Sequence, residues 1–471
     1  MRRGALVALA GSILALAGAL PSIAATADWP SYLGGPAHHS MNAAATAITP
    51  ANSASLTPAW TFHADAATQP DQPAASFLAS PTVWNGTVFI GSDTGVFYGV
   101  DAQTGIEVWH QDLGYAPALT CPSGRGIVST ATVADDPALG KTVVYVGGGD
   151  GKLYALDAAN GDVLWFAVVV DPGTTDNEGY NWASPVVVGE HVLMGIASNC
   201  DRPLVRGGVR MFDRTTGARL GPHWTVPKGS VGGSVWATPA ATGSYLWITT
   251  GNAAAGKDPG ESFSIVRLDE STLASRERWT VPTAHADLDF GSSPTRFSAT
   301  IGGETVQMTG ACSKNGRFYA LEALSLADGP VWSRRLGITA GTTGAGSCLA
   351  AAIFDAAAKK LYTASNQTTV DGVTVPAALR ALRPASGTVG WETALPSGPV
   401  MGSPTLNGSG LIAAATFSFV RPNALYLVDA SDGGIVRTID MDGAVFAQPV
   451  FAGSDLFVAT TNNDLICYSL P

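Results

Sequence analysis

Charged residues are scarce in this chain of 471 residues: Asp, Glu, Lys and Arg make up only 13% of it, and 37 acidic residues outnumber 26 basic ones. The formal net charge of −11 excludes a polycationic surface, so the sequence predicts no binding to nucleic acid or anionic membranes. Intrinsic disorder is excluded as well, because 46% of the residues are hydrophobic and supply ample material for a core.

Signatures of common catalytic sites are also missing. The chain has no G-x-S-x-G or H-E-x-x-H motif, and its Gly-rich segment 147–152 departs from a phosphate-binding loop at Val146 and Leu153. None of the five cysteines belongs to a C-x-x-C or C-H motif, so neither a zinc ribbon nor a covalent c-type haem is encoded. His38 and His39 lie in an N-terminal arm, where we expect them to be mobile and to face solvent.

A long apolar run occurs only at the N-terminus. Arg2 and Arg3 precede the apolar stretch 5–20, and Ala25-Thr26-Ala27 forms an A-x-A cleavage site. This pattern predicts a secretory signal peptide over residues 1–27, removed to leave Asp28 first and a net charge of −13. The mature chain would then lack a transmembrane segment and lie in the periplasm or outside the cell; a retained membrane anchor is the alternative.

Turn-forming residues are abundant, with 55 Gly and 29 Pro, and they recur with a period. Residues 95–109 (GVFYGVDAQTGIEVW) and 151–165 (GKLYALDAANGDVLW) share an alternating strand, an Asp-x-x-x-Gly turn and a strand carrying Trp. The turn acids Asp101, Asp157, Asp213 and Asp269 are 56 residues apart. A period of this size with several short strands per unit indicates propeller blades or a solenoid.

Each repeat also begins with a strand that contains Ser-Pro, Thr-Pro or Gln-Pro. Counting these strands together with the turns gives eight repeats. The last repeat is one strand short at Pro471, whereas segment 56–64 carries Trp60 with no blade before it. Pairing this segment with the last repeat would close the ring and remove exposed sheet edges. The sequence therefore predicts an all-β, eight-bladed β-propeller over residues 59–471, after an N-terminal arm over 28–58. Most of the repeated Trp residues are then core residues between blades.

Loops that interrupt the repeat are the expected place for function. Two of them contain Cys121 and Cys200, which would form a disulfide if they meet on neighbouring blades, and Cys312 and Cys348 would pair in the same way. The alternative is that all the cysteines are reduced core residues. We expect carboxylate chemistry in a pocket on the propeller axis.

The segment DWPSYLGGPAHHSMN, the YALDAANGDVLW repeats and the eightfold count resemble pyrroloquinoline-quinone (PQQ) propellers over essentially the whole mature chain. The resemblance implies that Trp236 forms the floor under the quinone and that Asn252 binds calcium. It places the catalytic base in HADLDFGSSP (285–294), without deciding between Asp287 and Asp289. In CSKNGRFYAL it makes Lys314 the cation that contacts the quinone oxygens.

Two further segments are similar to cofactor loops of this family. TCPSGRG resembles the cysteine loop, which implies that Cys121 and Arg125 contact the cofactor, with Arg125 paired to a carboxylate of PQQ. A single cysteine stands where the dehydrogenases have two adjacent ones. In SNCDRPLVRGG the family's glutamate ligand is replaced, leaving Asp201 as the candidate calcium ligand, or as a surface partner of a neighbouring arginine.

These similarities imply a PQQ-dependent alcohol dehydrogenase, nearest to the polyvinyl-alcohol type, in which Ca²⁺ polarises the quinone and hydride passes to it from a small or polymeric alcohol. Electrons would leave through a separate acceptor such as a cytochrome c. Two alternatives are a non-catalytic propeller that serves as an interaction scaffold in the cell envelope, and a degenerate quinoprotein that binds without turnover.

Overall fold

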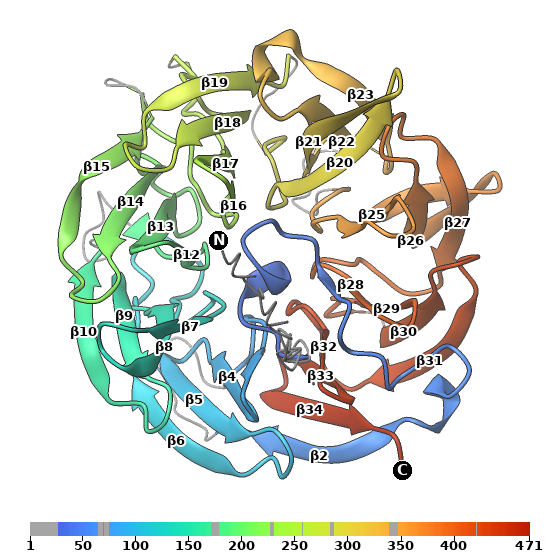
Figure 1. Ribbon diagram of the computed structural model, residues 1–471, viewed down its shortest axis with the longest axis horizontal. Helices are drawn as coiled ribbons and strands as arrows, with labels where there is room; N and C mark the ends of the chain where they lie inside the picture. Colours follow the sequence, from blue (N-terminus) through green and yellow to red (C-terminus); the bar gives the residue numbers. More distant parts are fainter. Residues whose placement is uncertain are drawn as a thin grey trace, which may run out of the picture.

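Eight four-stranded blades surround a central axis in the computed structural model (Figure 1). The structure describes residues 27–64, 69, 75–170, 179–226, 230–256, 258–282, 287–338, 347–420 and 422–471. The predicted eight-bladed propeller is confirmed. The predicted signal peptide lies, except for Ala27, outside the described residues.

Blades 1 to 4 follow the chain from the centre of the ring outward. Blade 1 contains β3 (Thr82–Trp84), β4 (Thr87–Gly91), β5 (Val96–Asp101) and β6 (Glu107–Asp112). Blade 2 contains β7 (Thr132–Asp136), β8 (Lys141–Gly147), β9 (Lys152–Asp157) and β10 (Val163–Val168). Blade 3 contains β12 (Val186–Val188), β13 (His191–Ser198), β14 (Gly208–Asp213) and β15 (Arg219–Thr225), and the short β11 (Gly179–Tyr180) also pairs with β13. Blade 4 contains β16 (Ala240–Thr242), β17 (Tyr245–Thr249), β18 (Ser264–Asp269) and β19 (Ser275–Thr280).

Blades 5 to 8 repeat this order. Blade 5 contains β20 (Thr295–Ile301), β21 (Glu304–Ser313), β22 (Arg317–Glu322) and β23 (Pro330–Arg335), with the 3₁₀ turn η3 (Leu326–Asp328) between the last two. Blade 6 contains β24 (Ile353–Asp355), β25 (Lys360–Val370), β26 (Val373–Leu382) and β27 (Val389–Leu395). Blade 7 contains β28 (Thr405–Asn407), β29 (Leu411–Ala415), β30 (Asn423–Asp429) and β31 (Ile435–Met441). Blade 8 contains β32 (Val450–Ala452), β33 (Asp455–Ala459) and β34 (Asp464–Ser469), and its outer strand is β2 (Thr57–His63).

The N-terminal strand closes the ring as predicted. Strand β2 pairs antiparallel with β34, so a strand from early in the chain shares one sheet with the last strand (Figure 1). Trp60 of β2 donates its indole N–H to the carbonyl of Ala102 at 3.1 Å and packs on the turn of blade 1. A Cβ on Gly105 would lie 2.5 Å from this ring, and Gly105 has φ +71°, so both the contact and the turn need glycine here.

The repeated Trp and the Asp-x-x-x-Gly turn are two halves of one inter-blade contact. In the turn of blade 1, Asp101 accepts hydrogen bonds from the backbone and hydroxyl of Thr104, which lower the pKa of this carboxyl. Five of the Trp residues pack on the next blade's turn and donate to its backbone, in the pairs Trp60–Ala102, Trp109–Ala158, Trp165–Arg214, Trp332–Pro384 and Trp391–Ala430. Trp224 instead donates to Glu261 Oε2 at 2.9 Å. This agrees with the prediction that these Trp residues are structural.

The Ser/Thr/Gln-Pro motif joins neighbouring blades at the axis. The hydroxyl of one blade accepts a hydrogen bond from the equivalent backbone N–H of the blade before it, in the pairs Ser80–Thr130, Thr130–Ser184, Ser184–Thr238, Ala351–Ser403 and Gln448–Ser80. The distances lie between 2.9 and 3.1 Å. These residues form a hydroxyl layer that satisfies buried backbone donors without strand pairing.

Removing one hydroxyl of this layer should destabilise the whole ring. We expect Ser184→Ala to lower the free energy of unfolding by about 1–3 kcal/mol, because the buried N–H of Thr130 loses its acceptor. Urea denaturation followed by fluorescence measures this loss. Ser431→Ala, at an exposed turn, is the matched control and should change stability by under about 0.5 kcal/mol. Equal stability of both variants would contradict the role of the layer.

The N-terminal arm runs across one end of the channel and contacts nearly every blade. Its elements are η1 (Tyr32–Gly34), β1 (Met41–Asn42), which pairs parallel with β28, and η2 (Ser53–Ser55). Its carbonyls accept from the inner strands of six blades, in the pairs Trp29–Val83, Pro30–Val133, Pro36–Ala241, Ala37–Arg296, His39–Phe354 and Ser40–Leu406. The Asn42 amide adds blade 8 through the carbonyl of Phe451 at 2.9 Å.

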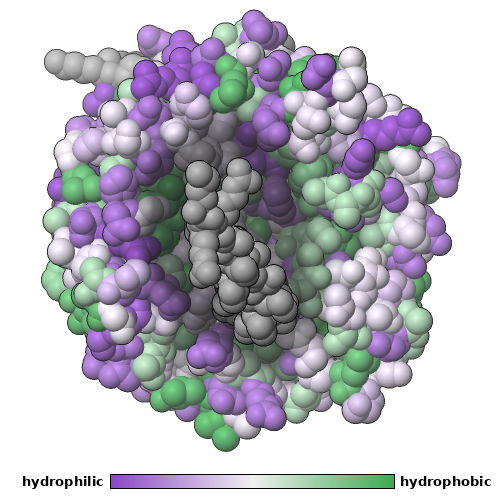
Figure 2. Space-filling view, in the orientation of Figure 1, coloured by the Kyte–Doolittle hydropathy of each residue, from purple (hydrophilic) through white to green (hydrophobic). Residues whose placement is uncertain are grey.

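The expectation of a mobile arm with solvent-facing histidines is wrong for His38. This side chain is 2% exposed, and its Nδ1 lies 2.9 Å from the carbonyl of Pro294, while burial lowers its pKa to about 4. His39 is exposed and stacks edge-on against Phe354. The face that carries the arm is hollowed toward its centre (Figure 2). In the part of the chain that the structure describes, no helix has the length and apolarity of a bilayer crossing.

Candidate active site

The candidate site lies at the end of the channel opposite the arm. Two residues before the hydroxyl layer, each blade contributes one residue to an apolar layer: Leu78, Val128, Trp182, Trp236, Gly291, Leu349, Met401 and Phe446. Two residues earlier still, the equivalent positions are Ser76, Gly126, Tyr180, Ser234, Asp289, Ser347, Pro399 and Ala444. Asp289 is the single acid of this outermost layer, directly above the apolar floor.

Asp289 is held between Trp236 and Lys314. The indole N–H of Trp236 donates to Asp289 Oδ2 at 3.2 Å, and Lys314 Nζ lies 2.8 Å from Asp289 Oδ1. The Lys314 ammonium also sits 5.1 Å from the centroid of the Trp236 ring. The backbone repeats this link, because the Lys314 N–H donates to the Asp289 carbonyl at 2.8 Å. The carboxylate, the ammonium and the indole ring are therefore positioned as one unit.

Burial sets the electrostatics of this pair. Asp289 is only 2% exposed, and desolvation raises the pKa of its carboxyl, although the Lys314 charge opposes the shift. Desolvation alone would lower the pKa of Lys314, but Asp289 and Asp287 outweigh it and raise that pKa. Asp289 is thus a stronger base than an aspartate in water, and the adjacent ammonium favours its ionised form.

Asp287 occupies a different environment. Its side chain is 48% exposed and forms a 2.9 Å ion pair with Lys314 from the solvent side. Its backbone has φ +63°, and its N–H donates to Asn252 Oδ1 at 2.9 Å. The two acids that the sequence could not separate are therefore distinguished by burial, and Asp289 has the environment expected of a general base.

Asn252 and Asp201 lie together beside this pair. Asn252 Nδ2 donates to Asp201 Oδ2 at 2.9 Å, and Asp201 is close enough to Asp289 to raise its pKa. Carboxylate and amide oxygens are the ligands that Ca²⁺ prefers, and turning the Asn252 amide over would direct its oxygen at Asp201. No group of three His, Cys, Asp or Glu side chains suited to a metal occurs in the described ranges. Asn252 would have to complete the donor set.

The residues present fit a flat, anionic quinone in chemical type. Trp236 supplies an aromatic face, Lys314 a cation above it, and Asp201 with Asn252 oxygen ligands for a hard cation. Trp236, Lys314 and Asp201 line one pocket together with Trp182, Cys200, Asp287, Asp289 and Phe446. Asn252 lies beside it, hydrogen-bonded to Asp201.

Arg125 and Cys121 lie at the margin of this pocket. Arg125 sits 5.7 Å from the centroid of Trp182, which lines the pocket, while Arg125 itself lines an adjoining hollow with Asp93 and Phe417. The Nε of Arg125 is buried with no hydrogen-bond partner among the described residues. Cys121 forms a disulfide with Cys200, so the first predicted bridge is confirmed and joins the loops that carry Arg125 and Asp201.

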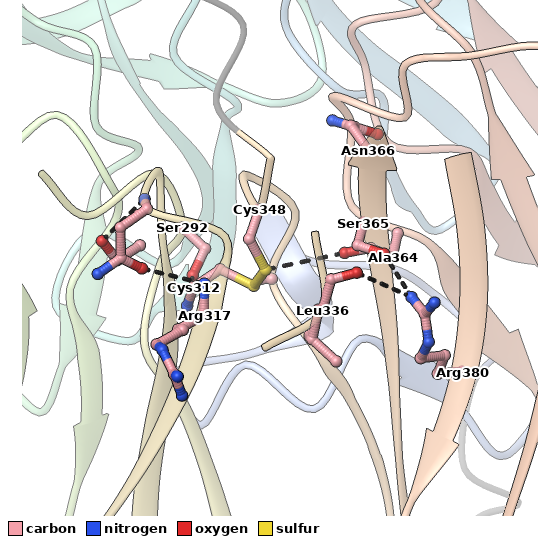
Figure 3. The surroundings of a disulfide bond; sticks show 12 residues. Ser292, Cys312, Arg317, Leu336, Cys348, Ala364, Ser365, Asn366 and Arg380 are labelled. Carbon is pink, nitrogen blue, oxygen red and sulfur yellow. Dashed lines mark hydrogen bonds between the residues drawn. A yellow bond between two sulfur atoms is a disulfide. The ribbon is translucent and has the colours of Figure 1, made fainter. Parts of the chain in front are cut away.

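The second predicted disulfide, Cys312–Cys348, is confirmed as well. It joins the end of β21 to the segment that leads into β24, and the Cys312 N–H donates to Ser292 Oγ at 2.8 Å (Figure 3). Lys314 follows two residues after Cys312, so the bridge fixes the strand end that presents the ammonium. Cys467 is buried as the free thiol expected from an odd count.

Sequence reasoning missed Trp182, Leu349 and Phe446. Each lies two residues before the Ser/Thr/Gln-Pro position or its equivalent, as Trp236 does. Counting back two residues from that motif in every blade would therefore have identified all three residues from the sequence. Gly291 breaks this layer because Leu349 occupies its space: a Cβ on Gly291 would lie 2.4 Å from Leu349 Cδ2.

Sequence comparisons match the chain to quinoprotein alcohol dehydrogenases and also to a tetrathionate hydrolase of Acidithiobacillus ferrooxidans, which is 26% identical over 227 residues, 48% of this chain and 40% of that protein. The quinohemoprotein alcohol dehydrogenase of Comamonas testosteroni is 27% identical over 208 residues, which are 43% of this chain and 26% of that protein. The quinoprotein alcohol dehydrogenase PedH of Pseudomonas putida is 25% identical over 315 residues, 57% of this chain and 49% of its own. The chain thus spans between a quarter and a half of the length of these relatives.

Solved structures show the same fold. A europium-containing methanol dehydrogenase superposes with a TM-score of 0.76 at 15% identity, covering 94% of this chain and 98% of its own. BamB of Moraxella catarrhalis superposes less closely, with a TM-score of 0.53 at 16% identity over 88% and 97% of the two chains. Residues 376–470 also match the family described as outer membrane protein assembly factor BamB.

The longest family match covers residues 29–325, well over half of the chain, and includes the segments that carry Trp236, Asn252, Asp289 and Lys314. Its description is the β-propeller domain of glucose, ethanol and alcohol dehydrogenases that use PQQ. The chain therefore belongs to the PQQ-type dehydrogenase propeller family.

Proposed function

We propose that this protein is an exported, PQQ-dependent alcohol dehydrogenase in which Asp289 is the general base. The observation that carries the proposal is the buried Asp289 carboxylate, held by Trp236 and Lys314 in the single acidic position of the outermost axial layer. A structural ion pair would not need an aromatic floor and a cluster of oxygen ligands beside it.

The residues divide the chemistry among them. Oxidation of an alcohol removes a proton from its hydroxyl and a hydride from its carbon. Asp289 takes the hydroxyl proton, and its raised pKa makes it a more effective base at neutral pH. PQQ, when bound with calcium, supplies the oxidant that receives the hydride. Trp236 would support the flat ring of the cofactor, Lys314 would supply a cation for its oxygens, Asp201 and Asn252 would hold the metal ion, and Arg125 with Cys121 would lie at the rim.

Electrons then pass to a separate acceptor such as a cytochrome c, which matches the haem-free sequence and the quinohemoprotein relatives. The secretory pattern of residues 1–27 supports the proposal that the reaction takes place in the periplasm or outside the cell. The second candidate function is an envelope scaffold, favoured by the BamB match of residues 376–470.

A cofactor titration separates these two functions. We expect the purified chain to bind PQQ in the presence of Ca²⁺, seen by absorbance and calorimetry, and then to reduce a dye with an alcohol. Trp236→Leu should weaken PQQ binding about tenfold, because the stacking surface is lost. Phe166→Ala, an exposed ring on the outer strand β10, is the control and should bind normally. Absence of binding by the unmodified chain would favour the scaffold.

A further inference from the structure

In blade 7, one loop at the mouth of the site is longer than its equivalents in blades 1, 2 and 8. The connection between the second and third strands has four residues in blades 1, 2 and 8 (92–95, 148–151 and 460–463). In blade 7 the same connection spans 416–422, which is seven residues, of which 421 lies outside the described part. The additional residues include Phe419 and Val420. Departures from a repeat are where a propeller places function.

The position of this loop is fixed by the repeat itself. The Phe417 N–H donates to the carbonyl of Pro399 at 2.7 Å, the same bond that Lys314 makes to Asp289 two blades earlier. Phe417 therefore occupies in blade 7 the place that Lys314 occupies in blade 5. Asn423 closes the loop, accepting from the Ser418 N–H at 2.7 Å and donating to the Ser418 carbonyl at 2.9 Å.

Three aromatic rings connect the reactive pocket to the surface through this loop. Phe446 lines the pocket with Asp289 and Trp236. The Phe417 centroid lies 5.6 Å from Phe446 and 4.9 Å from Phe419, both edge-on. Phe419 is 78% exposed and Val420 90%, the two most exposed large apolar side chains in the described chain. Adjacent exposed apolar side chains in a hydrogen-bonded loop indicate a binding surface.

The hollow beside these rings has a lining of mixed polarity. Phe417 and Phe419 contribute aromatic rings to it, and its polar residues are Ser76, Asp93, Ser123, Arg125, Ser418, Asn423, Asp442, Thr461 and Asn462. Such a hollow suits an amphipathic molecule whose apolar part lies along the rings. Because Phe446 borders both the apolar layer and the reactive pocket, a chain on these rings would reach toward Asp289.

We propose that Phe446, Phe417, Phe419 and Val420 form an apolar wall that binds the hydrocarbon part of an alcohol and makes longer alcohols the preferred substrates. This inference rests on the proposed dehydrogenase function and names its substrate class. Burying each added methylene on the wall should raise kcat/KM about fourfold. The hydrocarbon then contributes selectivity while Asp289 acts on the hydroxyl.

The test compares ethanol, butanol and hexanol. In the unmodified, PQQ- and Ca²⁺-loaded chain, kcat/KM should rise with chain length; in Phe419→Ala and Val420→Ser the hexanol-to-ethanol ratio should fall about tenfold. Phe166→Ala removes another exposed phenylalanine far from the site and should leave the ratio unchanged. Hexanol binding to the cofactor-free chain, followed by saturation-transfer NMR, should weaken in Phe419→Ala and not in Phe166→Ala.

The two readouts separate this inference from the function on which it rests. If no alcohol is oxidised but hexanol binding still depends on Phe419, the proposed dehydrogenase function is wrong, whereas the binding of hydrocarbon by the apolar wall is supported. If alcohols are oxidised with no chain-length preference, or the preference survives both substitutions, the wall is not a substrate site. A Phe419→Ala defect seen only with a protein electron acceptor, and absent with a dye, would overturn the inference in favour of a docking surface for that acceptor.

Discussion

Replacing Asp289 by Asn should lower kcat for alcohol oxidation by roughly 10²–10⁴-fold, the range over which a positioned general base acts. The amide keeps the shape of the carboxylate and a hydrogen-bond acceptor for Trp236, so the floor of the site should persist. We therefore expect PQQ binding, measured by absorbance, to change little compared with the loss of turnover.

Asp287→Asn is the matched comparison because it changes the neighbouring acid that the sequence could not set apart. Its side chain is half exposed, and Lys314 keeps its closer partner Asp289, so we expect less than a tenfold loss of kcat. A larger loss in Asp287→Asn than in Asp289→Asn would reverse the assignment of the base. Equal and small losses in both would remove the catalytic carboxylate from the proposal.

Replacing Lys314 by Met should cost about 3–5 kcal/mol of folding free energy at pH 8, because it leaves the buried Asp289 carboxylate without its partner. The loss should be smaller at pH 5. Burial raises the folded pKa of Asp289 above its unfolded value, so the folded chain holds this proton longer and stability falls as pH rises between the two values. Without Lys314 the folded pKa of Asp289 rises further, so stability falls over a wider pH range and by a larger total amount.

Urea denaturation at the two pH values measures the effect. Lys152→Met is a suitable control, since Lys152 pairs with Asp150 in a partly exposed bridge and should contribute under about 1 kcal/mol at either pH. A loss in Lys314→Met that is the same at pH 5 and pH 8 would show that the ammonium acts through packing on Trp236 and not through the charge of Asp289.

The propeller fold could be predicted from the sequence because short turn and strand patterns recur along the chain. The Asp-x-x-x-Gly turns and the Trp residues form one inter-blade contact, and this is why both repeat together along the chain. The unpaired strand around Trp60 and the truncated last repeat were complementary, and β2 joins β34 accordingly. Trp236, Asn252, Asp201 and Lys314 were found by resemblance, and the structure brings them to one end of the channel.

What the sequence did not predict depends on convergence in space. Asp287 and Asp289 are two residues apart, and only the turn at Asp287 and the burial of Asp289 separate them. The arm has few apolar residues in a regular pattern, because its contacts with seven blades run through backbone carbonyls and one amide, which any sequence supplies. From the sequence, Phe417 would be taken for a residue at the end of a strand. Its position equivalent to Lys314 is seen only when the backbone hydrogen bonds of the two residues are compared.

The arm and the closing strand also determine when this protein can be completed. Strand β2 precedes the other seven blades in the chain, but its partner β34 follows them. The arm docks on inner strands from seven blades, so its site forms only after those blades exist. Such distant pairing slows folding, and until it is reached both open sheet edges are exposed to other chains.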